Sequence, residues 1–159
     1  MVEIAVFPGR FLVGAKATFI AAGHQNSNGP VVIGQLWAEM SREFFQLDLA
    51  RDEFPVGIGA MWPTESGVAG EMTYFAGYEV SALPESLDEL ESLELDAGSY
   101  AFVSHTDGMA TLSQTVERFY SQVLPESGLA RRWGMDLEVY QDPDESGTPQ
   151  TVLIAAPVQ

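Results

Sequence analysis

The chain has 159 residues, of which 46% are apolar and 11% aromatic, and it contains no cysteine. This composition argues against disorder, and the absence of thiols excludes disulfides and thiolate metal sites. Seven basic residues against 23 acidic ones give a formal net charge of −16, which repels phosphate backbones, so we expect no direct binding of DNA or RNA.

The first part of the chain predicts a strand, a helix and two further strands. Residues rich in β-branched and aromatic side chains, bounded by turn-forming residues, place the strands at 11–21, 56–63 and 71–80. Apolar residues that recur every three or four positions predict the helix, from Ile33 to near Arg51. Its apolar stripe consists of Leu36, Trp37, Met40, Phe44 and Leu47. A loop, 23–30, precedes this helix, and an acidic connector with an extended end, 81–95, follows the last strand.

The same order of elements recurs in the second part of the chain. The predicted strands are 98–106, 135–143 and 150–158, and an amphipathic helix that ends at Pro125 and Gly128 follows the first of them. The apolar stripe of this helix consists of Leu112, Val116, Phe119 and Val123. We therefore expect one α+β domain, 1–159, built from two strand-helix-strand-strand halves, 1–80 and 95–159. Pseudo-twofold symmetry would give an antiparallel sheet with two helices and a central ligand groove.

The strand at 135–143 alternates strictly between apolar and polar residues. One face carries Met135, Leu137 and Val139, and the other carries Asp136, Glu138 and Tyr140. Periodicity alone favours a solvated Glu138, because most carboxylates on strands face water.

Three stretches, 71–80, 95–108 and 124–143, resemble the GyrI-like small-molecule-binding family, which includes effector-binding domains of AraC-type and MerR-type regulators. Trp37 also lies where such proteins often carry a tryptophan. The resemblance implies the duplicated fold and a groove lined by aromatic residues with an acidic floor, and Glu138 occupies the position of that acid. We expect a stand-alone form without a DNA-binding domain, because the sheet domain uses almost all of the chain.

A carboxylate in an apolar cleft is stabilised by an entering organic cation, and aromatic faces attract that cation as well. We therefore expect a ligand that is amphipathic, aromatic and cationic, such as a drug or an effector. The predicted ligand-binding residues are Glu138, Trp37, Met61, Tyr74, Tyr78, Phe102 and Tyr140. Glu79 is expected to be structural, and His105 is expected to be a surface or hydrogen-bonding residue rather than a catalyst.

Other classes of site find little support in the sequence. With only two histidines, His24 and His105, we expect no metal, no cofactor and no Ser-His-Asp triad. No run approaches the roughly 20 apolar residues of a membrane span, and the N-terminus lacks a signal-peptide pattern. The sequence therefore predicts a cytoplasmic protein without a membrane partner.

Two alternative functions remain open at this point. Some proteins of the family resemble hydrolases of cyclopropane-containing toxins, in which Glu138 would act as a general base. A gyrase-inhibitory or other protein-binding role would use the acidic connector, 85–96, against gyrase or a regulator. A second polar residue of perturbed ionisation beside Glu138 would favour the enzyme, whereas a lone carboxylate among aromatic residues favours a binder. We expect binding rather than catalysis.

Overall fold

The computed structural model describes residues 2–49 and 52–159, which group into two compact units. Unit 1 combines Met1–Gly9 with Asp96–Gln159, and unit 2 is Arg10–Leu95. Each unit is an antiparallel sheet with a helical segment, so the predicted α+β class is confirmed. The single domain over 1–159 and its central groove stay predictions.

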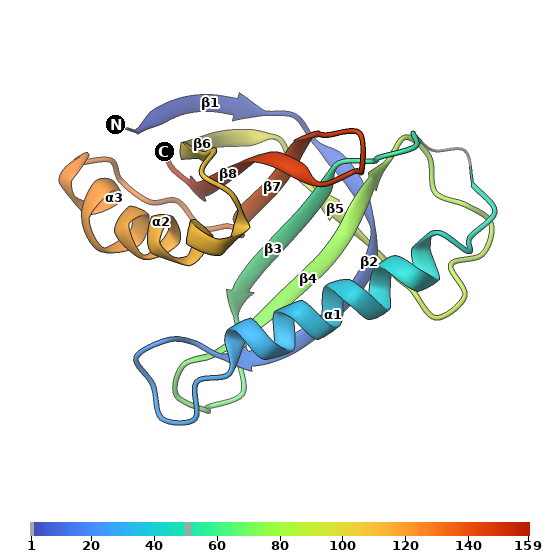
Figure 1. The fold of residues 1–159 in the computed structure, drawn as a ribbon. Helices are drawn as coiled ribbons and strands as arrows, with labels where there is room; N and C mark the ends of the chain where they lie inside the picture. The colour runs from blue at the N-terminus through green and yellow to red at the C-terminus, as the bar shows by residue number, and fades with distance from the viewer. Residues whose placement is uncertain (1, 50–51) are drawn as a thin grey trace. The chain divides into compact units, whose positions relative to one another are not determined.

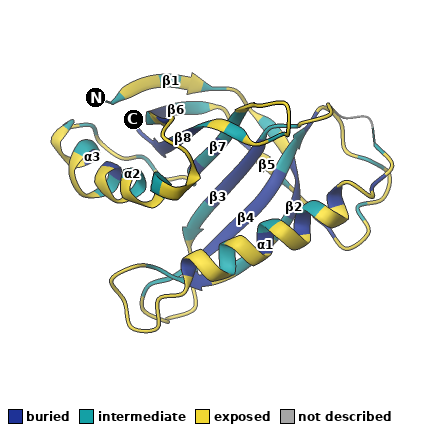
Figure 2. Ribbon diagram, in the orientation of Figure 1, coloured by how far each residue is buried: buried dark blue, intermediate teal, exposed yellow. Residues whose placement is uncertain are grey.

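Unit 2 contains four strands in the order β3-β4-β2-β5 and one helix, α1. The elements are β2 (Arg10–Ile20), α1 (Gly29–Phe44), β3 (Gly57–Pro63), β4 (Glu71–Val80) and β5 (Glu91–Leu95). The helix runs along one face of these strands (Figure 1). Figure 2 shows β3 and β4 as largely buried and the outer side of α1 as exposed. The apolar stripe of α1 packs on the sheet as predicted, with Leu36, Met40 and Phe44 buried.

The bounds of α1 differ from the prediction at both ends. The helix begins at Gly29, inside the segment expected to be a loop, because Pro30 suits the first helical turn, where its missing N–H is not needed. It ends at Phe44, and Leu47 is buried in the turns that follow. The end predicted near Arg51 is therefore wrong, and Arg51 itself lies outside the described residues.

Unit 1 contains four strands in the order β1-β6-β8-β7. The strands are β1 (Glu3–Phe7), β6 (Gly98–His105), β7 (Asp136–Pro143) and β8 (Pro149–Pro157). The helical segment runs through η1 (Met109–Thr111), α2 (Leu112–Arg118), the π-helical η2 (Phe119–Val123) and α3 (Leu124–Glu126). Its predicted stripe packs against the sheet around the buried Phe119. Pro125 lies inside α3, and the chain leaves the helix at Ser127 and Gly128.

The internal repeat is visible in the strand order. β2, β3 and β4 of unit 2 correspond to β6, β7 and β8 of unit 1, and each unit adds one edge strand, β5 or β1. The sequence analysis did not place β1, whereas β5 lies at the extended end expected of the acidic connector, 81–95. Each of them directly precedes, in the chain, the first strand of the other unit: β1 leads into β2, and β5 leads into β6. Each edge strand thus pairs with the first strand of its own unit rather than with the strand that follows it in the chain: β1 pairs with β6, and β5 pairs with β2.

Candidate functional site

Strand β7 presents its polar residues to the helical side of the unit 1 sheet. Glu138 pairs with Ile154, and Ile154 pairs with Val103, so the three share one face. Ile154 belongs to the apolar cluster formed with the helical segment. Leu137 and Val139 are buried on the opposite face, as the alternation predicted. Glu138 is partly buried, and therefore it is not the fully solvated carboxylate that periodicity alone favours.

Two tyrosines and a second carboxylate surround Glu138 on this face. The Tyr140 hydroxyl donates a hydrogen bond to Glu138 Oε1 at 3.3 Å. Tyr120, on η2, has a raised pKa, because burial disfavours its phenolate and the charges of Asp136 and Glu138 add to that effect. The Tyr120 hydroxyl therefore stays protonated and can act as a hydrogen-bond donor. Together these residues form an acidic, tyrosine-rich surface on β7 and η2.

Asp136 differs from Glu138 in its contacts, because it forms an ion pair with Arg131. Arg131 Nη2 lies 2.5 Å from Asp136 Oδ1, and the Asp136 side chain is 17% exposed. Burial raises the pKa of Asp136, while Arg131 and an interaction with the Tyr120 hydroxyl lower it, and burial dominates. Asp136 is therefore a carboxylate with perturbed ionisation two residues from Glu138.

Sequence reasoning did not single out Asp136, Tyr120 or Arg131 as site residues. Alternation placed Asp136 on the face of Glu138, and that signal was sufficient to include it. Tyr120 follows Val116 of the predicted stripe by four positions, and this spacing places it on the same side of the helical segment, where both pack on the apolar cluster.

Phe102 does not join this surface. It pairs with Ala155, which pairs with Leu137, so it lies on the opposite face of the sheet from Glu138. Its ring packs against Phe7 with 5.7 Å between centroids. We therefore remove Phe102 from the candidate site.

The other predicted residues lie together in unit 2, between α1 and the sheet. Met61, Tyr74 and Tyr78 share the sheet face that packs on α1, and Trp37 comes from the helix. The Trp37 Nε1 donates a hydrogen bond to the Tyr74 hydroxyl at 3.0 Å, and its ring meets Tyr78 edge-on, with centroids 5.9 Å apart. Tyr74 is fully buried, whereas Trp37, Met61 and Tyr78 are partly exposed. The geometry groups all four in one aromatic cluster.

Two glycines of β3 make room for this cluster. A Cβ at Gly59 would lie 1.9 Å from the Tyr74 hydroxyl oxygen, and a Cβ at Gly57 would lie 3.3 Å from the Trp37 ring. The facing positions of β3 are thus Gly57, Gly59 and Met61, where the equivalent strand β7 carries Asp136, Glu138 and Tyr140. The repeat has diverged into an aromatic unit and an acidic unit.

Glu79 and His105 both form polar contacts within their own units. Arg10 Nη1 lies 3.5 Å from Glu79 Oε2. His105 is 4% exposed, and its ring nitrogens lie 2.7 Å from Thr115 Oγ1 and 2.6 Å from the Gly108 carbonyl oxygen. His105 therefore fixes the turn into the helical segment.

Among the residues that the structure describes, no group of three or more His, Cys, Asp or Glu side chains is arranged to hold a metal ion. In the same residues, every helix is too short or too polar to span a membrane.

A family model of the GyrI-like small molecule binding domain matches residues 7–158. The chain belongs to this family. The transcriptional regulator BrlR of Pseudomonas aeruginosa is 29% identical over 109 residues, which cover 68% of this chain and 38% of the regulator. The chain thus matches less than two fifths of that relative.

Solved structures of the GyrI-like fold match over the whole chain. SAV2435 bound to tetraphenylphosphonium has a TM-score of 0.72 at 17% identity and covers 100% of this chain and 94% of its own. EcmrR in a complex with DNA has a TM-score of 0.70 at 11% identity and covers 100% of this chain and 57% of its own. At these identities the likeness establishes the fold alone.

Proposed function

We propose that this GyrI-like domain binds amphipathic aromatic cations and that Glu138 recognises their charge. The observation that carries the proposal is the placement of Glu138: a partly buried carboxylate that accepts a hydrogen bond from the Tyr140 hydroxyl, on the sheet face against which Tyr120 of η2 packs. A cation compensates the desolvation of such a carboxylate, and tyrosine faces attract it. The net charge of −16 attracts cations over longer range. SAV2435, which shares the fold, was solved with the cation tetraphenylphosphonium.

Calorimetric titration with tetraphenylphosphonium and with the neutral triphenylphosphine oxide tests this proposal. The wild type should bind the cation more tightly, and Glu138→Gln should weaken cation binding by about 2–5 kcal/mol, the range for truncating one partner of a buried charge pair. Glu145→Gln is the matched control, because Glu145 is exposed in the β7–β8 turn and the net charge changes equally. Equal binding of both compounds by all three proteins would contradict the proposal.

We also propose that the aromatic cluster of unit 2, Trp37, Met61, Tyr74 and Tyr78, is a ligand-binding surface, and this proposal does not depend on Glu138. Trp37, Met61 and Tyr78 are partly exposed, and the buried Tyr74 holds the Trp37 indole in place. Tetraphenylphosphonium should therefore quench tryptophan fluorescence, and Trp37→Phe should remove most of that quench. Trp133→Phe is the control, because Trp133 is 90% exposed on a loop of unit 1. A quench that survives in Trp37→Phe would exclude this position.

Hydrolysis is the second candidate function, because the raised pKa of Asp136 beside Glu138 is the feature that favours an enzyme. A pair of carboxylates in different environments can divide acid and base roles. Arg131 and Tyr120 both engage Asp136, however, which suits a structural partner better than a proton carrier. Turnover of a cyclopropane-containing substrate that is abolished by Glu138→Gln would establish the enzyme instead.

A further inference from the structure

We propose that Arg131, through its ion pair with Asp136, limits the site to ligands with one positive charge. This inference rests on the proposed function, in which Glu138 meets the charge of the ligand. It concerns what happens to the second carboxylate on the same face of β7.

Asp136 and Glu138 form a pair of carboxylates on the same face of β7. Side chains two residues apart on a strand point to the same face and lie roughly 7 Å apart. The charges of both carboxylates act on the Tyr120 phenol, so both lie near the same hydroxyl group. Without a protein cation, this pair would suit a dication of matching length.

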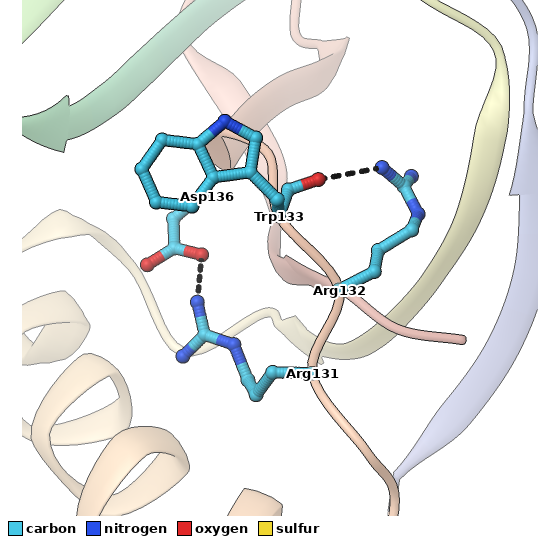
Figure 3. Close-up of polar contacts among 4 residues, drawn as sticks. All are labelled: Arg131, Arg132, Trp133 and Asp136. Carbon is cyan, nitrogen blue, oxygen red and sulfur yellow. Dashed lines mark hydrogen bonds and ion pairs between the residues drawn. The ribbon is translucent and has the colours of Figure 1, made fainter.

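Arg131 supplies that protein cation. Its guanidinium lies against Asp136, whereas the neighbouring Arg132 turns away and bonds the Trp133 carbonyl oxygen (Figure 3). The Asp136 side chain is 17% exposed and the Arg131 side chain is 47% exposed, so the guanidinium is the more solvent-accessible member of the ion pair. A second positive charge on a ligand would meet the guanidinium before it reached Asp136, and like charges repel.

The test compares two flat probes of similar shape, N-methyl-4-phenylpyridinium with one charge and methyl viologen with two. In methyl viologen the charges lie at the two ends of a rigid two-ring body, a separation comparable to the roughly 7 Å between residues two apart on a strand. Titrations are run in mildly alkaline buffer, because burial raises the pKa of Asp136 and removing Arg131 removes a group that lowers it. The wild type should bind the monocation at least as tightly as the dication.

Arg131→Gln should raise the affinity for methyl viologen relative to the monocation by about tenfold, the effect of one modest charge interaction on a binding constant. The double variant Arg131→Gln/Asp136→Asn restores the net charge of the wild type and should cancel this gain. Arg118→Gln is the control for net charge, because Arg118 is exposed on α2, and it should leave the ratio unchanged. Asp136→Asn alone leaves the Arg131 cation uncompensated and should weaken binding of the monocation.

The outcomes separate this inference from the proposed function. If the monocation binds in a Glu138-dependent way but the ratio stays constant in Arg131→Gln, the role of Arg131 is overturned and the proposed function stands. If neither probe binds the wild type, both are overturned. An equal gain in Arg118→Gln would assign the effect to net charge and would also overturn the role of Arg131. Circular dichroism of each variant verifies folding, and the Asp136→Asn result gives a second readout if Arg131→Gln is unstable.

Discussion

The Trp37 indole of α1 donates a hydrogen bond to the Tyr74 hydroxyl of β4 at 3.0 Å, and this bond ties the exposed helix to the centre of its sheet. Tyr74→Phe removes the acceptor and keeps the ring. We expect a loss of about 1 kcal/mol in the free energy of unfolding, measured in urea, and a shift in the emission of Trp37. Tyr78→Phe is the control, because the Tyr78 hydroxyl is 2.9 Å from Ser41 Oγ and the Trp37–Tyr74 bond is unaffected. Unchanged emission in Tyr74→Phe would show that the bond does not hold the indole.

Gly59→Ala should disrupt the same cluster by steric overlap. The added Cβ would lie 1.9 Å from the Tyr74 hydroxyl oxygen, so either Tyr74 or β3 must move. Overpacking of this kind costs about 1–3 kcal/mol in the free energy of unfolding. Gly34→Ala is the matched control: nothing lies within 4 Å of its added Cβ, and alanine in a helix interior should stabilise α1 by about 0.5–1 kcal/mol. The thermal midpoint should therefore fall in Gly59→Ala and rise in Gly34→Ala. Equal shifts in the two variants would contradict the overlap between a side chain at position 59 and Tyr74.

Tyr120 should make the protein sensitive to alkali. Its folded-state pKa is raised above the ordinary value of 10.0, so the folded protein keeps a proton that the unfolded chain releases. The stability from this difference is fully present below pH 10.0 and is lost as the pH rises above it. The free energy of unfolding of Tyr120→Phe should therefore fall less steeply than that of the wild type as the pH rises through this range. Urea unfolding midpoints measure this difference.

Val123→Ala gives the control for Tyr120→Phe. It removes an apolar contact of the same helical segment but no titrating group, so its stability should fall with pH as steeply as that of the wild type. If Tyr120→Phe showed that same slope, the phenol would not be the group responsible.

A stack of three side chains should stabilise unit 1. Phe7 and Tyr100 stack with 4.8 Å between ring centroids, and Arg132 Cζ lies 5.0 Å from the Tyr100 centroid. Arg132 Nη2 also donates to the Ser99 carbonyl oxygen at 3.2 Å. Arg132→Gln should lower the free energy of unfolding by about 1–2 kcal/mol, because it removes a cation–π contact and a hydrogen bond.

Arg132→Lys should recover only part of that loss, since lysine keeps the charge but not the planar, multidentate guanidinium. Arg118→Gln changes the net charge equally at an exposed position and should stay within about 0.5 kcal/mol of the wild type. If the two arginine-to-glutamine variants were equally stable, the stack would contribute nothing.

The sequence predicted those parts of the fold that depend on hydrophobic periodicity. The strict alternation of 135–143 correctly separated Leu137 and Val139 from Glu138, and the helical stripes correctly identified Met40 and Phe119 as core residues. The edge strand β1 was missed because its pairing with β6 joins residues nearly a hundred positions apart, as in Glu3 with Phe102. Such a partner leaves no local signal.

The candidate site was predictable only in part for a related reason. Glu138 and Tyr140 follow from alternation and family resemblance, but Phe102 was assigned without knowing which face of β6 it occupies. The register of β6 against β8 settles that face, and a shift of one residue would reverse it. Arg131 reaches Asp136 across the turn before β7, which no periodic pattern describes.

The pairing of β1 with β6 has a consequence for the order in which the protein folds during synthesis. Strand β1 is made first, yet its partner β6 follows only after the whole of Arg10–Leu95. That intervening segment contains every strand of unit 2, so unit 2 can close while β1 still lacks its partner. The pairing of β1 with β6 can form only after that segment has been synthesised, and long-range pairing of this kind is slow. The nascent chain therefore carries β1 without its partner strand until Gly98–His105 has been synthesised, and an unpaired strand of this kind is prone to aggregate in that interval.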